Sequence, residues 1–182
     1  VVSAQNVDVS IDGPVSIKGG DELELTVTVT NNNDVALESA VLTLAYPSGT
    51  RVVDDLETEL ARHREVLDRI EPGGTIEHTF SSVVFGQKDE VKEITATVEF
   101  RVEDSNATFT ADEAYAVTIS ASPVSVTIDA PADVNSGQAI DFVVTVASNS
   151  TSPLEDLLFS AEYPFGFTFT ESDPEPLFNE SV

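Results

Sequence analysis

The sequence predicts an all-β protein built from antiparallel β-sandwiches, and three observations predict it. Apolar and polar residues alternate with a period of two along most of the chain, as they do in strands that bury one face. Gly, Pro, Asn and Asp separate these segments, which are rich in Val and Thr. The sequence also repeats itself. About seven short strands in roughly 110 residues are typical of a two-sheet sandwich.

Each expected strand follows from one alternating segment and is bounded by turn residues. Residues 12–14, 18–21, 31–34, 47–49 and 72–74 carry the turn signals. Residues 55–70 differ, because Leu56, Leu60, Leu67 and Ile70 have helical spacing, so a short local helix is an open alternative there. The expected strands are 7–11, 22–30, 41–46, 75–80, 94–102 and 115–120.

The repeat aligns the segment starting at Val7 with the segment starting at Val124, an offset of 117 residues, without a gap. Upstream, the pair Ser3 and Ala4 falls on Ser120 and Ala121. We therefore expect residues 1–4 to be the tail of a preceding repeat, 5–121 a complete sandwich and 122–182 the first half of a second, in an excerpt from a longer array. Identical pairs include Ile11/Ile128, Asp12/Asp129, Pro14/Pro131, Gly20/Gly137, Asn32/Asn149, Glu38/Glu155, Tyr46/Tyr163, Pro47/Pro164 and Gly49/Gly166.

Charge and composition exclude several classes of protein. Thirty-three Asp and Glu against eight Lys and Arg give a net charge of −25, the opposite of what phosphate binding needs, so no nucleic-acid partner is expected. Cys is absent, which excludes disulfide scaffolds, thiolate metal sites and Cys nucleophiles. No apolar run reaches the roughly 18 residues that span a bilayer, so this segment is not expected to insert directly into a membrane. Adaptation to high salt, secretion to a cell surface or simple solubility would each explain the acidity.

The residues also resemble a known group. The segments IDGPVSIKGGDELELTVTVTN, LTLAYPSG, LDRIEPGGT, AYAVTISASPVSVTIDAPADVNSGQ and a second AEYPFGFTF resemble the immunoglobulin-like repeat domains of unknown function that occur in tandem in large bacterial and archaeal cell-surface proteins, including membrane-anchored examples from candidate bacterial phyla. The resemblance covers essentially the whole chain. It implies an immunoglobulin-like antiparallel β-sandwich in tandem repeat and an extracellular structural or adhesive module, with no catalytic residues to carry across.

Catalysis has little support in the sequence. His63 and His78 are the only imidazoles, and the chain has no Gly-x-Ser-x-Gly nucleophile elbow. His78 alternates with Ile76 and Phe80 and is expected to point inward, whereas His63 lies in an exposed-looking segment. A chance Ser, His and Asp combination is expected in a chain so rich in Ser and Asp, so we expect no enzyme activity.

We expect no cofactor, and a weakly bound calcium ion is the open alternative. Extracellular modules can bind calcium weakly through carboxylate and carbonyl oxygens. The chain has no Asp-x-Asp-x-Asp-Gly loop, and an Asp before Gly-Pro more often forms a turn. The candidate ligands are Asp12, Asp34, Glu38, Asp104, Asp129 and Glu155.

Two covalent modifications are conceivable from the sequence. The chain has three Asn-x-Ser/Thr glycosylation sequons, which begin at Asn106, Asn149 and Asn179. Three sequons are not an excess over the number expected by chance in a chain rich in Ser and Thr. An intramolecular isopeptide bond would need a buried Lys beside Asn or Asp, but Lys18, Lys88 and Lys92 all look exposed.

We expect a non-catalytic extracellular spacer or stalk at the cell surface, with its anchor outside this segment and the neighbouring repeats of the same chain as its partners. The short link at 121–123 predicts that neighbouring repeats touch. The first alternative is an adhesin or binding module for a surface protein or glycan. The aromatic segment at Phe165 and Phe167 slightly favours this alternative. The second is a filament subunit assembled by strand complementation.

Overall fold

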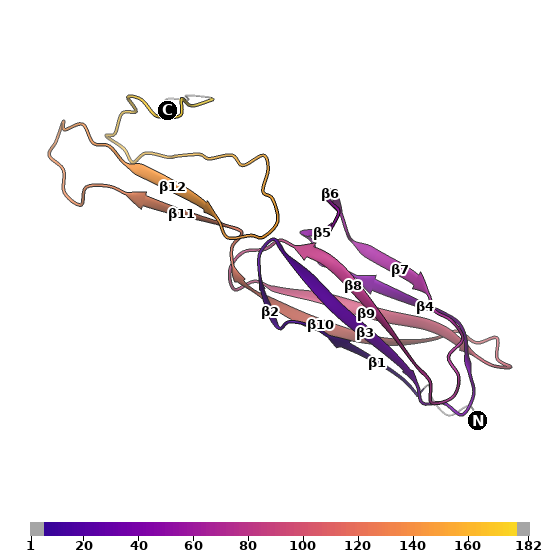
Figure 1. Ribbon diagram of the computed structural model, residues 1–182. Helices are drawn as coiled ribbons and strands as arrows, with labels where there is room; N and C mark the ends of the chain where they lie inside the picture. The colour runs from indigo at the N-terminus through magenta and orange to yellow at the C-terminus, as the bar shows by residue number, and fades with distance from the viewer. Residues whose placement is uncertain (1–5, 178–182) are drawn as a thin grey trace.

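The computed structural model describes residues 6–177, and these residues form β-strands and loops without a helix. Ten strands make two five-stranded sheets, in the orders β1-β3-β8-β5-β6 and β2-β10-β9-β4-β7, and a further two-stranded sheet, β11-β12, follows (Figure 1). The predicted all-β sandwich class is therefore confirmed. Within this range no helix is long and apolar enough to cross a membrane. The expected repeat tail at residues 1–4 lies outside the described residues.

The strands of the first sheet are β1 (Val7–Asp12), β3 (Asp21–Asn31), β8 (Thr75–Val84), β5 (Thr50–Val52) and β6 (Asp55–Glu59). Those of the second are β2 (Ser16–Lys18), β10 (Phe109–Ala121), β9 (Val91–Val102), β4 (Leu37–Ala45) and β7 (Arg62–Val66). Neighbouring strands are antiparallel except β2 and β10, which pair in parallel. The last two strands are β11 (Val124–Asp129) and β12 (Val143–Ser148).

The alternation of the sequence produces the core directly. Every second residue of β3 and β9 points between the sheets and is buried, whereas the residues between them face outward. Full burial of one such Val, Leu, Ile or Phe side chain stabilises the fold by about 1.5–3 kcal/mol. The largest fully buried side chains are Phe100, Leu23, Leu25, Leu37, Leu42, Leu44, Ile70, Ile94, Ile119, Val27, Val29 and Val84.

The alternative of a helix over residues 55–70 is wrong. This stretch forms β6 and β7, and β7 pairs with β4 from Val41↔Val66 to Ala45↔Arg62. Only Leu67 and Ile70 of the helically spaced residues are buried, and they follow β7 at the edge of the core. The free edge of β4 offers backbone hydrogen bonds along a whole strand, and this pairing outweighs the weak helical spacing.

The second unit, which we define as residues 124–177, begins with the same local geometry as the first. Strands β1 and β3 pair from Val7↔Asn31 to Asp12↔Thr26, and β11 and β12 pair from Val124↔Ser148 to Asp129↔Val143. Each of these positions is displaced by the same 117 residues. The left-handed backbone conformations at Gly20, Ser39 and Gly49 recur at Gly137, Asp156 and Gly166 with this displacement.

The second unit differs from the first in what covers its apolar face. Val9 is 7% exposed and Val29 is 1% exposed, but their counterparts Val126 and Val146 are 52% and 48% exposed. In the first unit β8 lies along the other edge of β3, whereas β12 pairs only with β11 within the described residues. The apolar residues of the second unit are therefore left exposed, because no further strand pairs with β11 or β12 among residues 6–177.

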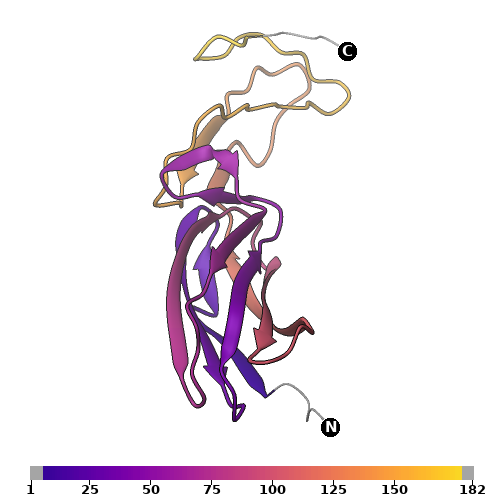
Figure 2. The ribbon, with the colours of Figure 1, turned by 90° about the vertical axis from the view of Figure 1, so that its right-hand side faces the viewer.

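The two units follow one another end to end. Figure 2 shows the second unit at the end of the sandwich where β2 and β10 finish and β3 begins, so that the molecule is elongated. The start of β1 and the last described residues lie at opposite ends (Figure 1).

Candidate functional site

The two histidines lie close together at the edge of the sandwich. His78 Nδ1 is 3.1 Å from Glu65 Oε1, and His63 Nε2 is 4.0 Å from Glu65 Oε2. Both imidazoles pack on Phe80, with ring centroids 5.2 Å away for His63 and 6.2 Å for His78. Because β7 and β8 belong to different sheets, this cluster joins the two sheets. The contacts of the two imidazoles are with Glu65 of β7 and Phe80 of β8.

The candidate calcium ligands do not converge. Glu38 is bound by Arg69, Asp104 lies in the turn after β9, and Asp34 lies in the loop after β3. Asp12 ends β1, while Asp129 and Glu155 belong to the second unit. Residues 6–177 contain no group of three or more His, Asp or Glu side chains arranged to hold one metal ion. Calcium binding therefore stays a prediction without a defined site.

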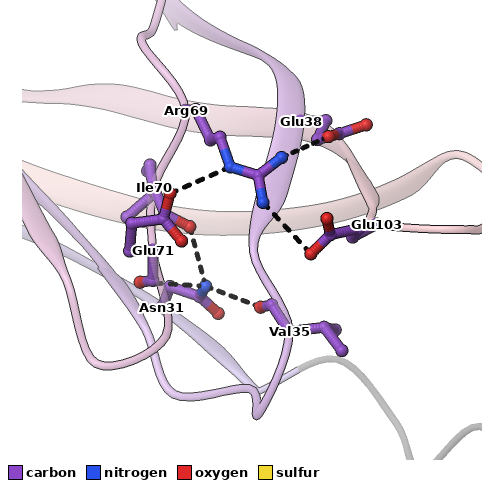
Figure 3. A network of polar contacts seen from close by, with 7 residues as sticks. All are labelled: Asn31, Val35, Glu38, Arg69, Ile70, Glu71 and Glu103. Atoms are coloured by element: carbon purple, nitrogen blue, oxygen red, sulfur yellow. Dashed lines mark hydrogen bonds and ion pairs between the residues drawn. The ribbon is translucent and has the colours of Figure 1, made fainter.

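A polar network secures the loops around the start of β4 (Figure 3). Arg69 donates from Nε to Glu71 at 2.9 Å, contacts Glu103 at 3.1 Å through Nη2, and contacts Glu38 through Nη1. Hydrogen bonds to Glu103 and Glu71 raise the pKa of Arg69 above its ordinary value, so the guanidinium stays charged. One cation thus joins three carboxylates of a strongly acidic protein.

Asn31 is the buried centre of the same region (Figure 3). Its side chain is 0% exposed, and Nδ2 donates to the carbonyls of Val35, Ile70 and Glu71 at 2.9, 3.0 and 3.2 Å. Its Oδ1 accepts from the backbone and side-chain nitrogens of Asn33. A buried amide is tolerated when its donors and acceptor are satisfied in this way. The sequence predicts only a turn at Asn31, and no pattern in it indicates this buried role.

Lys92 is buried, so the expectation that it is exposed is wrong. It occupies an inward position of β9, two residues before Ile94, and is 6% exposed. Its Nζ donates to the carbonyl of Ser48 at 3.0 Å and pairs with Glu90 at 2.7 Å. Neither contact is to Asn or Asp, so these contacts do not supply the partner that an isopeptide bond requires. The alternation of β9 would have revealed this burial.

The repeated Tyr-Pro element begins a turn after β4. Tyr46 packs against the core, and its backbone nitrogen donates to Ala61 O at 3.0 Å. Burial raises the pKa of the Tyr46 hydroxyl to about 12. The interpretation of this element as a turn with a packed ring fits the first unit. In the second unit the ring of Tyr163 lies near Phe142 and Phe169 and is 40% exposed.

The described glycosylation candidates differ in their surroundings. Asn106 is exposed in the loop between β9 and β10. Asn149 is partly buried, and its Nδ2 donates to Ser122 O at 3.0 Å. Asn179 lies outside the described residues.

A shallow recess of about 250 Å³ was not anticipated from the sequence. It lies where β4, β7 and β9 approach one another, and its lining includes Arg64, Arg101 and Glu99. Ser39 also lines it and has a φ of 52°, at the irregularity in the β4–β9 register.

A set of hydrogen bonds connects the two units, and we call this contact the joint. It consists of the loop Asn149–Thr151, the turn Gly19–Asp21 and the connecting residues Ser122 and Pro123. Ser150 Oγ donates to Gly20 O at 2.9 Å. The backbone nitrogen and the hydroxyl of Thr151 both donate to Asp21 Oδ1, at 3.1 and 3.0 Å.

The connecting residues are held from both sides. Ser122 Oγ donates to Gln87 Oε1 at 3.0 Å and accepts from the Lys88 backbone nitrogen at 3.1 Å. The backbone nitrogen of Asn149 donates to Pro123 O at 2.8 Å. A side chain at Gly19 would meet Gly86 O and the Pro123 ring, so only glycine fits this approach without displacement. The expected contact between neighbouring units is present, with residues that the sequence did not reveal.

Comparison with known proteins supports the fold. No protein-family model matches the chain, and no curated protein matches it in sequence. The native form of Escherichia coli alpha-2-macroglobulin is similar in structure, with a TM-score of 0.51, 16% identity, and coverage of 70% of this chain and 8% of that chain. The trypsin-activated form gives a TM-score of 0.50, 15% identity, and coverage of 71% and 8%. The chain thus corresponds to a small part of these proteins. It has an immunoglobulin-like β-sandwich fold.

Proposed function

We propose that this chain is part of a tandem array of immunoglobulin-like sandwiches that serves as a non-catalytic spacer in a cell-surface protein. Residues 5–121 would be one complete repeat, and residues 122–182 the first half of the next. The single observation that carries the proposal is the joint, because hydrogen bonds from Ser150 and Thr151 to the turn at Gly20 and Asp21 hold the units end to end. Repeats that contact only their neighbours extend a chain in one dimension.

Two further observations support this proposal. The strand register and the left-handed residues of the first unit recur after 117 residues, as expected for a repeated module. The net charge of −25 makes neighbouring molecules repel one another, which suits densely placed surface stalks. The proposed location is extracellular, in agreement with the group that the sequence resembles.

Small-angle X-ray scattering tests the proposed spacer. We expect an elongated particle whose scattering fits one fixed arrangement of the two units. Simultaneous substitution Asp21→Ala and Thr151→Ala removes both hydrogen bonds at Asp21 Oδ1 and should broaden the distribution of distances within the particle. Thr26→Ala is the matched control, because its hydroxyl is hydrogen-bonded to Thr79 within the first sandwich and is not part of the joint. A wild-type protein that scatters like freely moving units would refute the spacer proposal.

The open apolar face favours the filament subunit as a second candidate. Val126, Ile128 and Val146 are each about half exposed or more, and such a face next to an unpaired strand edge can accept a strand from another molecule. Light scattering after size-exclusion chromatography distinguishes the two candidates. Assembly that persists when the joint is disrupted would favour strand complementation. A stable monomer would refute strand complementation.

The binding-module alternative is supported by the recess near Arg64 and Arg101. Binding to a glycan array that is lost on Arg101→Ala would favour this alternative.

A further inference from the structure

Two arginines line the recess between β4, β7 and β9. Arg64 and Arg101 are both exposed, and neither forms an ion pair with a carboxylate among residues 6–177. By contrast, Arg51, Arg69 and Lys92 each pair with at least one Glu. Acids outnumber bases by thirty-three to eight in this chain, so few cations are left for a ligand. The recess brings two of them together and is a local centre of positive charge on an acidic surface.

The recess lies at an irregular part of the sheet. The pairing of β4 with β9 shifts its register between Glu38 and Val41, and Ser39 at this shift has a φ of 52°. Both Ser39 and Val41 line the recess. Such bulges re-aim side chains and are common beside binding sites. The volume of about 250 Å³ lies below the roughly 300–1,000 Å³ of pockets for drug-sized ligands, so the recess suits one small group.

Neighbouring repeats would leave the recess open. All its lining residues belong to the first unit, although the second unit is in place. The joint shows that a unit meets the preceding one through its loop at 149–151, whose counterpart in the first unit is 32–34. Asp156 is the counterpart of Ser39, and it is exposed although the first unit precedes it. A recess at this position therefore stays accessible in an array.

The polar groups around the recess define the class of ligand. The guanidinium fork of each Arg matches the oxygens of a carboxylate or a sulfate. The hydroxyls of Ser39 and Thr108 can donate or accept, and the carboxylate of Glu99 accepts from hydroxyl groups. Glu99 would repel a densely charged group such as a phosphate, and the net charge of −25 repels polyanions. A sugar with one negative charge and several hydroxyls satisfies all these groups.

We propose that this recess binds one acidic sugar unit of a glycan, with its carboxylate or sulfate held by Arg64 and Arg101 and a hydroxyl held by Glu99. The inference gives the binding-module alternative a ligand class. It does not depend on the spacer proposal, because every residue involved belongs to the first unit. A shallow recess buries little of its ligand, so binding of a single sugar is weak.

The second unit carries an acid where the first unit has Ser39. Asp156 lies 117 residues after Ser39 and has the same φ of 52°. An Asp is therefore compatible with this backbone conformation, which Asp tolerates better than most residues. At position 39 its carboxylate would neutralise the arginines and repel an anion. Ser39→Asp is thus a variant that should keep the fold and lose the ligand.

NMR titration of the full chain tests the ligand class, since amide shifts detect weak binding. The probes are methyl glucuronide, glucose 6-sulfate, the neutral methyl glucoside and acetate. We expect saturable shifts of the amides that line the recess with one or both acidic sugars, and binding at least about tenfold weaker with methyl glucoside and with acetate. The comparison of the two acidic sugars tells whether a carboxylate or a sulfate is preferred. Methyl glucoside that binds as well as both acidic sugars would overturn the role of the arginines, and acetate that binds as well would overturn the assignment of a sugar.

Variants locate the binding on the recess. Ser39→Asp, Arg64→Gln and Arg101→Gln should each weaken binding of the preferred sugar by about tenfold, the loss expected for one charge-assisted hydrogen bond. Arg62→Gln is the matched control, because Arg62 is exposed on the same strand as Arg64 but does not line the recess. Amide shifts far from the recess check that each variant is folded. A folded Ser39→Asp that binds like the wild type, or Arg62→Gln that loses as much binding as Arg64→Gln, would overturn the site.

Discussion

Replacement of Asn31 by Ala should be the most damaging single substitution among the polar residues of the first unit. The change removes three donated and two accepted hydrogen bonds from a side chain that is 0% exposed. Ile70 O keeps a bond from Leu37 N at 2.9 Å, and Glu71 O keeps one from Gly74 N at 2.8 Å. The uncompensated losses are therefore concentrated at the Val35 carbonyl and the Asn33 backbone nitrogen.

The expected magnitude follows from these two groups. A buried group left unsatisfied costs about 1–3 kcal/mol, and because both of these groups are only part-buried we take the low end and expect a loss of about 2 kcal/mol in the free energy of unfolding. For a sandwich of this size the Tm falls by about 4 °C per kcal/mol, or about 8 °C in total. Urea unfolding followed by circular dichroism measures the free energy, and the m value should stay unchanged because the same surface is exposed on unfolding.

Asn33→Ala is the graded control for this prediction. It removes the Asn33 Nδ2 bonds to Asn31 Oδ1 and Asn6 O and the bond that Asn33 Oδ1 accepts from Asn6 N, but it leaves the backbone bond from Asn33 to Asn31. The lost bonds are exposed or part-buried, so water replaces them in part and we expect a loss of about 1 kcal/mol. Should Asn31→Ala cost no more than Asn33→Ala, the assignment of Asn31 as the centre of this region would be refuted.

Three further predictions concern single side chains. The Tyr115 hydroxyl is buried without a partner among the described residues, so Tyr115→Phe should leave the Tm unchanged or raise it, and a fall of several degrees by calorimetry would contradict this. Arg69→Gln leaves three carboxylates without their shared cation, so the Tm should fall at low salt and the difference should shrink in 1 M salt, as thermal scans at both salt concentrations can check. Lys92 holds the pKa of Glu90 below its ordinary value of 4.5, so the stabilisation by Glu90 is present above that pH and is lost as the pH falls through the folded-state pKa. Wild type and Glu90→Gln should therefore differ in urea midpoint at pH 7, and the difference should shrink as the pH falls below 4.5. A difference independent of pH would exclude this pairing.

The sequence predicted the strands better than the contacts between loops. Alternation placed β1, β3 and β9 because one face of each is buried, and this cause acts locally. It failed for β7, since Arg62, His63 and Arg64 offer no apolar alternation and the strand is selected by the free edge of β4. Turn residues such as Asn31 and Asp21 look alike in sequence, although one is buried in its own unit and the other binds the next unit. That difference arises only when distant segments meet.

Lys92 illustrates a different failure. Its position in an acidic stretch at an expected loop suggested that it is exposed, but strand register is cooperative, and Ile94, Ala96 and Val98 fix which face of β9 points inward. The flexible stem of Lys crosses the apolar region and carries its ammonium to the Ser48 carbonyl at the rim. Register therefore decides burial in a strand more strongly than residue type does.

The parallel pairing of β2 with β10 affects how the sandwich resists a pulling force. When the two ends of the chain are pulled apart, β2 is drawn one way and β10 the other, along the direction of the strands. The bonds between them, Thr118 N to Val15 O at 3.0 Å, Ser120 Oγ to Ile17 O at 2.9 Å and Gly19 N to Ala121 O at 2.8 Å, then bear the tension together in shear. An antiparallel hairpin pulled at its open end would release its bonds one after another. The same short strand that lies beside the joint therefore makes the sandwich resist extension, and a module in this position can transmit tension to its neighbour before it unfolds.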